Sequence, residues 1–164
     1  MFVGGRLRAR IAGLSDHYSI SLWIWNGMPN DGRAVSGWFF SRGYNQSLAT
    51  FGDHLGIGGR SFNAGKLVFF TGNNPKKAAA GKTEIPRWSW QHVVLIRSEQ
   101  TVRVYLNGQI EIETAASAGE LAELTECFFG GRSDNDSNWE GRLDEIAVYD
   151  RALTAREIAR LEVK

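Results

Sequence analysis

The segment WEGRLDEIAVYDRALT, residues 139–154, and the AREIARL that follows it decide the fold of this chain. The first part alternates polar and apolar residues, which is the period of a β-strand. Thr154 stands three residues before Glu157, the spacing of a capping box, in which each side chain satisfies a free backbone donor at the start of a helix. Leu153 and Ile158 occupy the positions of a hydrophobic staple. The segment therefore predicts a closing strand that leads directly into a short C-terminal helix.

Alternation of period two also dominates the rest of the chain. Residues 90–97 and 101–106 flank a short polar turn and indicate a hairpin. Asn107-Gly108 then gives the strongest short hairpin signal in the sequence. We count ten to twelve short strands and find no alternation of strands with helices, which argues against a parallel α/β sheet. We predict an all-β fold, a two-sheet antiparallel jelly-roll sandwich with a short C-terminal helix.

Length and charge exclude several classes of protein. A chain of 164 residues can bury a sizeable core in one domain. With 19 basic and 18 acidic residues, the net charge of +1 gives no electrostatic footprint for nucleic acid or an anionic membrane. No apolar run approaches the roughly 20 residues that span a bilayer. Cys127 lies in an apolar strand, and we predict that it is a small buried hydrophobic residue.

The two ends of the chain bear on its origin. The N-terminal MFVGGR has no apolar signal-peptide segment, so we find no export signal in this fragment. The periodic segments reach almost to both ends. We therefore expect residues 1–164 to be a single domain taken from a larger multidomain protein.

Five short motifs, in order, give the chain its resemblance to a known family. It resembles the laminin-G-like modules of the concanavalin A-like lectin and glucanase superfamily. The resemblance implies a recognition module, extracellular or periplasmic, which binds a glycan or a protein, often with calcium, and lies beside other domains of its parent chain. It also implies that Trp23 and Trp90 are core residues. The motifs are YSISLWI at 18–24, WQHVV at 90–94, VRVYLNG at 102–108, FGG at 129–131 and GRLDE at 141–145.

Calcium is the one cofactor that we expect. Many members of the family carry an aspartate just after the first strand's phenylalanine, and it helps to hold calcium alongside an aspartate of the last strand. Here Val3 follows Phe2, while Asp144 remains, so half of that pattern is present. The loop DNDSN at 134–138 is rich in the oxygen ligands that calcium prefers, although a polar turn that caps its own backbone is the favoured interpretation. The candidate calcium ligands are Asp134, Asp136, Asn138 and Asp144.

A glycan site needs flat aromatic faces for the sugar ring and planar polar groups for its hydroxyls. Segment 38–46, WFFSRGYNQ, supplies both, and a neighbouring segment adds a carboxylate and an imidazole. Trp139 offers a second aromatic group beside a polar loop. The candidate ligand-binding residues are Arg42, Tyr44, Asn45, Asp53, His54 and Trp139.

Catalysis has weak support in the sequence. Glycosidases need two carboxylates about 5–9 Å apart around the scissile bond. Glu111 and Glu113 share one face of a strand, but Ile112 lies between them and no third acid follows, so we interpret them as solvated strand carboxylates. We predict a non-catalytic module, not an enzyme, with a glycan as its ligand. The alternative is a structural or protein–protein interaction module without a free-sugar ligand, and a glycoside hydrolase ranks third.

Overall fold

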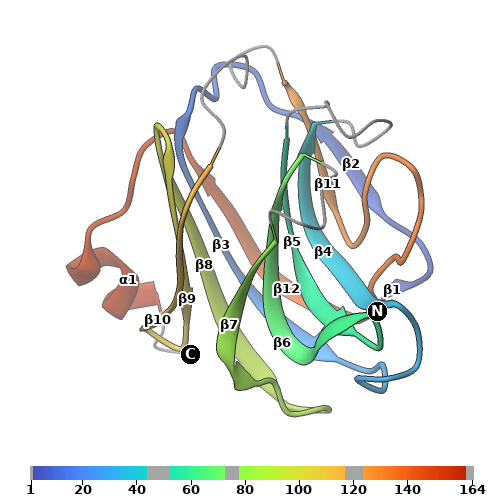
Figure 1. The fold of residues 1–164 in the computed structure, drawn as a ribbon. Helices are drawn as coiled ribbons and strands as arrows, with labels where there is room; N and C mark the ends of the chain where they lie inside the picture. Colours follow the sequence, from blue (N-terminus) through green and yellow to red (C-terminus); the bar gives the residue numbers. More distant parts are fainter. Residues whose placement is uncertain (1, 44–51, 73–77, 117–123, 162–164) are drawn as a thin grey trace.

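Two antiparallel sheets stacked face to face make up the protein, seen from one side in Figure 1. The computed structural model describes residues 2–43, 52–72, 78–116 and 124–161. Sheet A contains, in spatial order, β1 (Phe2–Val3), β12 (Glu140–Tyr149), β3 (His17–Asn26), β8 (Trp90–Ser98), β9 (Thr101–Leu106) and β10 (Gln109–Ala115). Sheet B contains β2 (Leu7–Arg10), β11 (Glu126–Phe129), β4 (Val35–Gly43), β5 (Gly52–Gly59), β6 (Phe62–Thr71) and β7 (Ala79–Glu84). The predicted jelly-roll sandwich is confirmed.

The core lies between the two sheets and follows from the alternation of side chains along each strand. On β3 the even-numbered residues, such as Leu22 and Ile24, point inward and are fully buried. On β5 of the opposite sheet, Leu55 and Ile57 do the same. These residues belong to one continuous cluster, which also takes in Cys127, as predicted. Burial raises the pKa of the Cys127 thiol to about 11, so the thiol stays protonated.

Helix α1 (Ala155–Leu161) packs on the outer face of sheet A, the side turned away from sheet B in Figure 1. The predicted capping box is confirmed. The Thr154 N–H donates to Glu157 Oε2 at 2.8 Å, and the Glu157 N–H donates to Thr154 Oγ1 at 3.4 Å. Leu153 and Ile158 share a cluster with Val94 of β8. The helix therefore covers part of this outer face. It is not a membrane span, since no helix in the described ranges is long and apolar enough to cross a bilayer.

The turn between β9 and β10 is also as predicted. Asn107 and Gly108 have φ values of 47° and 73°. Positive φ at both central residues is the requirement of a type I′ hairpin turn, and asparagine and glycine reach it at least cost.

Two tryptophans expected in the core lie elsewhere. Trp23 and Trp90 are half-buried on the outer face of sheet A, because Leu22 and Ile24 already fill the inward positions of β3. The Trp23 ring packs on His92, with ring centroids 5.2 Å apart. Strand alternation alone predicts this outward direction. The expectation of a core position came from the family resemblance and was wrong.

Candidate ligand-binding groove

Adjacent residues of β5 point to opposite sides of sheet B. Asp53 shares the inward face with Leu55, and its carboxylate is fully buried. It accepts hydrogen bonds of 2.5 Å from both Arg97 Nη1 and the Tyr18 hydroxyl. Burial raises the pKa of the Asp53 carboxyl, and the Arg97 guanidinium opposes that rise. Asp53 is thus placed in the interior, not at the surface where we expected it.

Arg42 belongs to the same interior cluster. Its guanidinium lies 4.7 Å from the centroid of the Tyr18 ring and donates to backbone carbonyls of Leu14 at 2.6 Å and Ser15 at 2.7 Å. The side chain is fully buried, so it joins the β2–β3 connection to β4. Tyr44 and Asn45, the next two candidates, lie outside the described residues.

Trp139 is also interior. Its side chain is 1% exposed, packs edge-on against Phe39 at 5.5 Å and donates its indole N–H to the Arg142 carbonyl at 3.3 Å. The polar residues before it suggested a surface position, but Trp139 begins the turn into β12 and closes one end of the core.

The outer face of sheet B carries a groove of about 310 Å³. Its floor forms where β5 has glycines: a Cβ built at Gly56 would lie 2.8 Å from Cε3 of Trp38, so the indole can lie directly over the backbone. Phe70 meets the Trp38 ring edge-on at 5.0 Å, and Phe62 packs on Phe70 at 5.3 Å. The residues that line the groove are Ala34, Val35, Trp38, Ser61, Phe62, Phe70, Arg132 and Asp136.

One wall of the groove is polar and comes from the β11–β12 connection. Arg132 lies 4.8 Å from the centroid of the Trp38 ring, a distance at which a cation is attracted to the ring face. The same guanidinium is 2.7 Å from Asp134 Oδ2 and 3.7 Å from Asp136 Oδ2. The Asp136 side chain is 71% exposed, whereas that of Arg132 is only 7% exposed. The groove therefore places aromatic rings, a guanidinium and an exposed carboxylate side by side.

His54 lies beneath this groove, against Trp38. Its ring is 6.3 Å from the Trp38 ring, and its Nδ1 is 2.6 Å from the Ser41 hydroxyl oxygen. Burial lowers the pKa of His54 to about 3, and the positive charge of Arg132 acts in the same direction. The imidazole is therefore neutral at physiological pH. Of the predicted ligand-binding residues, His54 alone among those described adjoins the groove.

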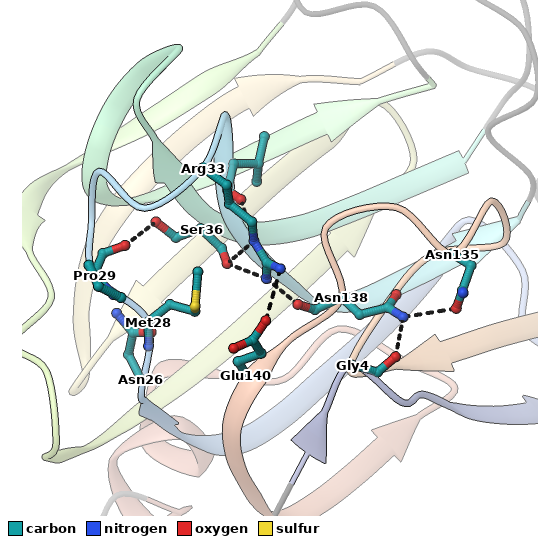
Figure 2. Close-up of polar contacts among 10 residues, drawn as sticks. Gly4, Asn26, Met28, Pro29, Arg33, Ser36, Asn135, Asn138 and Glu140 are labelled. Carbon is teal, nitrogen blue, oxygen red and sulfur yellow. Dashed lines mark hydrogen bonds and ion pairs between the residues drawn. The ribbon is translucent and has the colours of Figure 1, made fainter.

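The predicted calcium ligands are not gathered around one point. Asp134 and Asp136 face Arg132, and the Asp136 N–H donates to Asp134 Oδ1 at 3.1 Å, as in a polar turn. The Asn138 amide donates to the Gly4 carbonyl at 2.6 Å and to Asn135 Oδ1 at 2.8 Å (Figure 2). Asp144 lies on β12 across from Trp23, on the outer face of the other sheet. Within the described ranges no three His, Cys, Asp or Glu side chains come together to hold a metal ion.

The two acids weighed for glycoside hydrolysis have other contacts. Glu111 accepts hydrogen bonds from the Lys82 N–H at 2.6 Å and the Thr83 hydroxyl at 2.6 Å, and so ties the edge strand of sheet A to that of sheet B. These bonds lower the pKa of Glu111 against the effect of its partial burial. Glu113 pairs with Arg103 at 3.1 Å.

Sequence reasoning missed most of the groove. Trp38 is the first residue of segment 38–46, but the candidate ligand-binding residues from that segment were Arg42, Tyr44 and Asn45. Phe62 and Phe70 are eight residues apart on β6, a spacing that keeps both on one face. Arg132 carried no local signal, because its partner Trp38 is distant in the sequence and meets it only in the folded sandwich.

Comparisons with known proteins identify a superfamily for the chain and several structures with the same fold. A family model described as "Concanavalin A-like lectin/glucanases superfamily" matches residues 6–159, while no curated protein matches. The chain is similar to domain 4 of AbnA, a GH43 extracellular arabinanase from Geobacillus stearothermophilus, solved in complex with arabinotriose (21% identity, TM-score 0.67, covering 93% of this chain and 70% of that chain). It is also similar to the CBM40 of the Ruminococcus gnavus IT-sialidase bound to α2,3-sialyllactose (12%, 0.69, 97% and 98%). A third similar structure is the SAP-like pentraxin from Limulus polyphemus (19%, 0.67, 96% and 75%).

Proposed function

The chain belongs to the concanavalin A-like lectin/glucanase superfamily, and we propose that it is a non-catalytic module that binds a glycan in the groove of sheet B. One observation carries the proposal: the half-buried ring of Phe62 adjoins Arg132 and Asp136 in one groove, over a floor made by the buried rings of Trp38 and Phe70. A sugar ring offers apolar C–H faces to aromatic rings, and its hydroxyls suit a few fixed polar groups. Small-molecule sites combine these two kinds of surface.

The arrangement of charge in the groove favours binding over hydrolysis. Hydrolysis of a glycoside needs two carboxylates that flank the scissile bond. Asp134 and Asp136 instead approach the same nitrogen of Arg132 from one wall of the groove. The two similar sugar-bound structures are of an arabinanase domain and a sialidase module, and at 21% and 12% identity they support the fold while leaving the sugar open.

A single open groove gives modest affinity. We expect a dissociation constant of about 1 mM to 1 μM, equivalent to roughly 4–8 kcal/mol. Sister modules in a larger parent protein would raise the effective affinity by holding several grooves near one glycan. We infer that the parent protein is exported and that this domain acts in the extracellular space or the periplasm, where it would encounter such glycans.

The test compares two arginines that lie at the same distance from a tryptophan ring, one buried in the groove and one exposed outside it. Arg132 lies 4.8 Å from the Trp38 ring in the groove, and Arg142 lies 4.8 Å from the Trp25 ring on the outer face of sheet A. Glycan microarray screening first finds a ligand, and titration calorimetry then measures affinity. We expect Arg132→Met and Phe62→Ala each to weaken binding about tenfold, which is about 1.4 kcal/mol. Arg142→Met should leave it unchanged. Equal losses from both arginine variants would place the ligand elsewhere.

A second candidate, a protein-interaction module, is favoured by one observation in the turn between β7 and β8. Trp88 is 62% exposed, and the Arg87 guanidinium lies 4.2 Å from its ring centroid. Aromatic residues and arginine are enriched at protein interfaces. If the module ignores every glycan, and Trp88→Ala weakens its association with a neighbouring domain of the parent chain in sedimentation experiments, this function replaces the first.

A further inference from the structure

Arg33, in the connection between β3 and β4, makes five hydrogen bonds through one guanidinium, most of them drawn in Figure 2. Nε donates to the carbonyls of Val35 and Ser36, each at 3.0 Å. Nη2 donates to Ser36 O at 2.6 Å and to the Asn138 carbonyl, while Nη1 donates to Glu140 Oε1 at 3.2 Å. Three carbonyl oxygens and one carboxylate thus surround a single positive charge.

These oxygens belong to three parts of the chain. Val35 and Ser36 begin β4, Asn138 lies near the end of the connection from β11, and Glu140 begins β12. Ser36 and Asn138 are both buried residues. Carbonyl oxygens brought together in a buried place need a donor or a cation between them, because leaving them unsatisfied costs free energy. Arg33 supplies that cation from within the chain.

Carbonyl and carboxylate oxygens are also the ligand set that calcium prefers. The residues expected to hold calcium do not form such a set, since Asp134 and Asp136 face Arg132 and Asp144 lies on the other outer face. We propose that the Arg33 guanidinium takes the place of a divalent cation in this module, and that removing it opens a site that calcium can fill. The native chain then needs no metal to fold.

The same arginine bears on the groove, and this step rests on the proposed function. Ala34 and Val35, which follow Arg33, line the groove, and so do Arg132 and Asp136 of the β11–β12 connection. The Trp38 N–H donates to the Ser137 carbonyl at 3.0 Å, beside the bond from Arg33 to Asn138. Arg33 therefore acts as a positioning residue that fixes the β3–β4 and β11–β12 connections relative to each other. Glycan binding by the native chain should then be insensitive to calcium.

The experiment measures thermal unfolding of the native chain, Arg33→Met and the control Arg60→Met, each in EDTA and in calcium chloride. Arg60 is an exposed arginine on the nearby β5–β6 turn. We expect the native chain and the control to melt at the same temperature in both buffers. Arg33→Met should melt roughly 5–10 °C lower in EDTA, since several hydrogen bonds to a charged group are lost. Calcium should recover part of that loss in this variant alone.

A direct probe keeps the proposal testable if the melting curve of the variant is broad. Terbium binds calcium sites, and Trp139, next to Asn138 and Glu140, can sensitise its luminescence. We expect terbium luminescence from Arg33→Met, none above background from the native chain, and loss of the signal from Arg33→Met combined with Glu140→Gln. Calcium stabilisation of the native chain, or a variant that responds to neither ion, overturns the proposal. If no glycan binds at all, the proposed function fails while these measurements still decide the role of Arg33.

Discussion

Asp53 and His54 are neighbours on β5, yet their side chains point into two different regions, one between the sheets and one on the outer face of sheet B. Inside the sandwich, Asp53 meets Arg97 and Tyr18, and Arg42 lies 4.7 Å from the Tyr18 ring. On the outer face, above His54, Arg132 lies 4.8 Å from the Trp38 ring and two aspartates face it. Both regions contain an arginine stacked on an aromatic ring beside a carboxylate.

Access of water separates the two regions. Asp53 is fully buried and has its partners within the protein, whereas the Asp136 side chain is 71% exposed. A charge inside must be paired at all times, so the interior cluster is committed to stability. A charge at the rim is solvated when no ligand is present, so it is free to exchange water for a sugar hydroxyl. The same residue types therefore hold the fold in one place and offer a binding surface in the other.

Arg97→Met should give the largest effect, because it leaves the Asp53 carboxylate buried without its cation. We expect a loss of about 3–5 kcal/mol in the free energy of unfolding, measured by chemical denaturation. Ligand affinity of the protein that remains folded should not change. The double variant Arg97→Met with Asp53→Asn should recover part of the loss, since no buried carboxylate is then left without Arg97, and the buried Arg42 keeps its hydrogen bonds to backbone carbonyls. A double variant as unstable as the single one would refute the interior role.

His54 should make stability depend on pH. The unfolded histidine has a pKa of about 6.5, whereas burial lowers the pKa of folded His54 to about 3. Between these two pKa values the unfolded state binds a proton that the folded state does not bind. The free energy of unfolding therefore falls as the pH drops from 6.5 towards 3. We expect about 1.4 kcal/mol per pH unit, or roughly 2 kcal/mol between pH 7 and pH 5.

The measurement for His54 is chemical denaturation across this range, on the native chain and on His54→Asn. Asparagine keeps a polar group near Ser41 without the titration. Burial also lowers the pKa of His92, so the native curve contains both histidines and the difference between the two proteins isolates His54. That difference should shrink as pH falls. If stability falls with pH in parallel for the native chain and His54→Asn, the His54 ring takes up protons in the folded state. The region beneath the groove would then not be closed to water.

Arg132→Met should give the smallest effect on stability. The Arg132 side chain is only 7% exposed, but the side chains of its partners Asp134 and Asp136 are 27% and 71% exposed, so water can solvate both carboxylates once the guanidinium is gone. We expect a loss of about 1.5 kcal/mol in denaturation, the typical contribution of a hydrogen bond to a charged group, against the tenfold loss of ligand affinity given above. A loss as large as that of Arg97→Met would show that Arg132, like Arg97, holds the fold.

Local signals in the sequence were reliable where the physics is local. The Thr154 and Glu157 cap, the Asn107-Gly108 turn and the burial of Cys127 depend on a few neighbouring residues or on simple hydrophobicity, and each is confirmed. The inward direction of Asp53 could also have been predicted from the sequence, because Asp53 lies two residues from Leu55 on the inward face of β5. We gave its polar character more weight than its register.

The sequence by itself determined that this chain forms two antiparallel layers with a capped helix at the end, since alternation, turn residues and capping residues act over a few positions. Only the tertiary structure decided which polar residues meet. Arg132 reaches Trp38 across 94 positions, and Arg33 reaches Asn138 and Glu140 across more than 100. Such contacts depend on how distant strands are brought side by side, and no period or motif within a single strand records that choice.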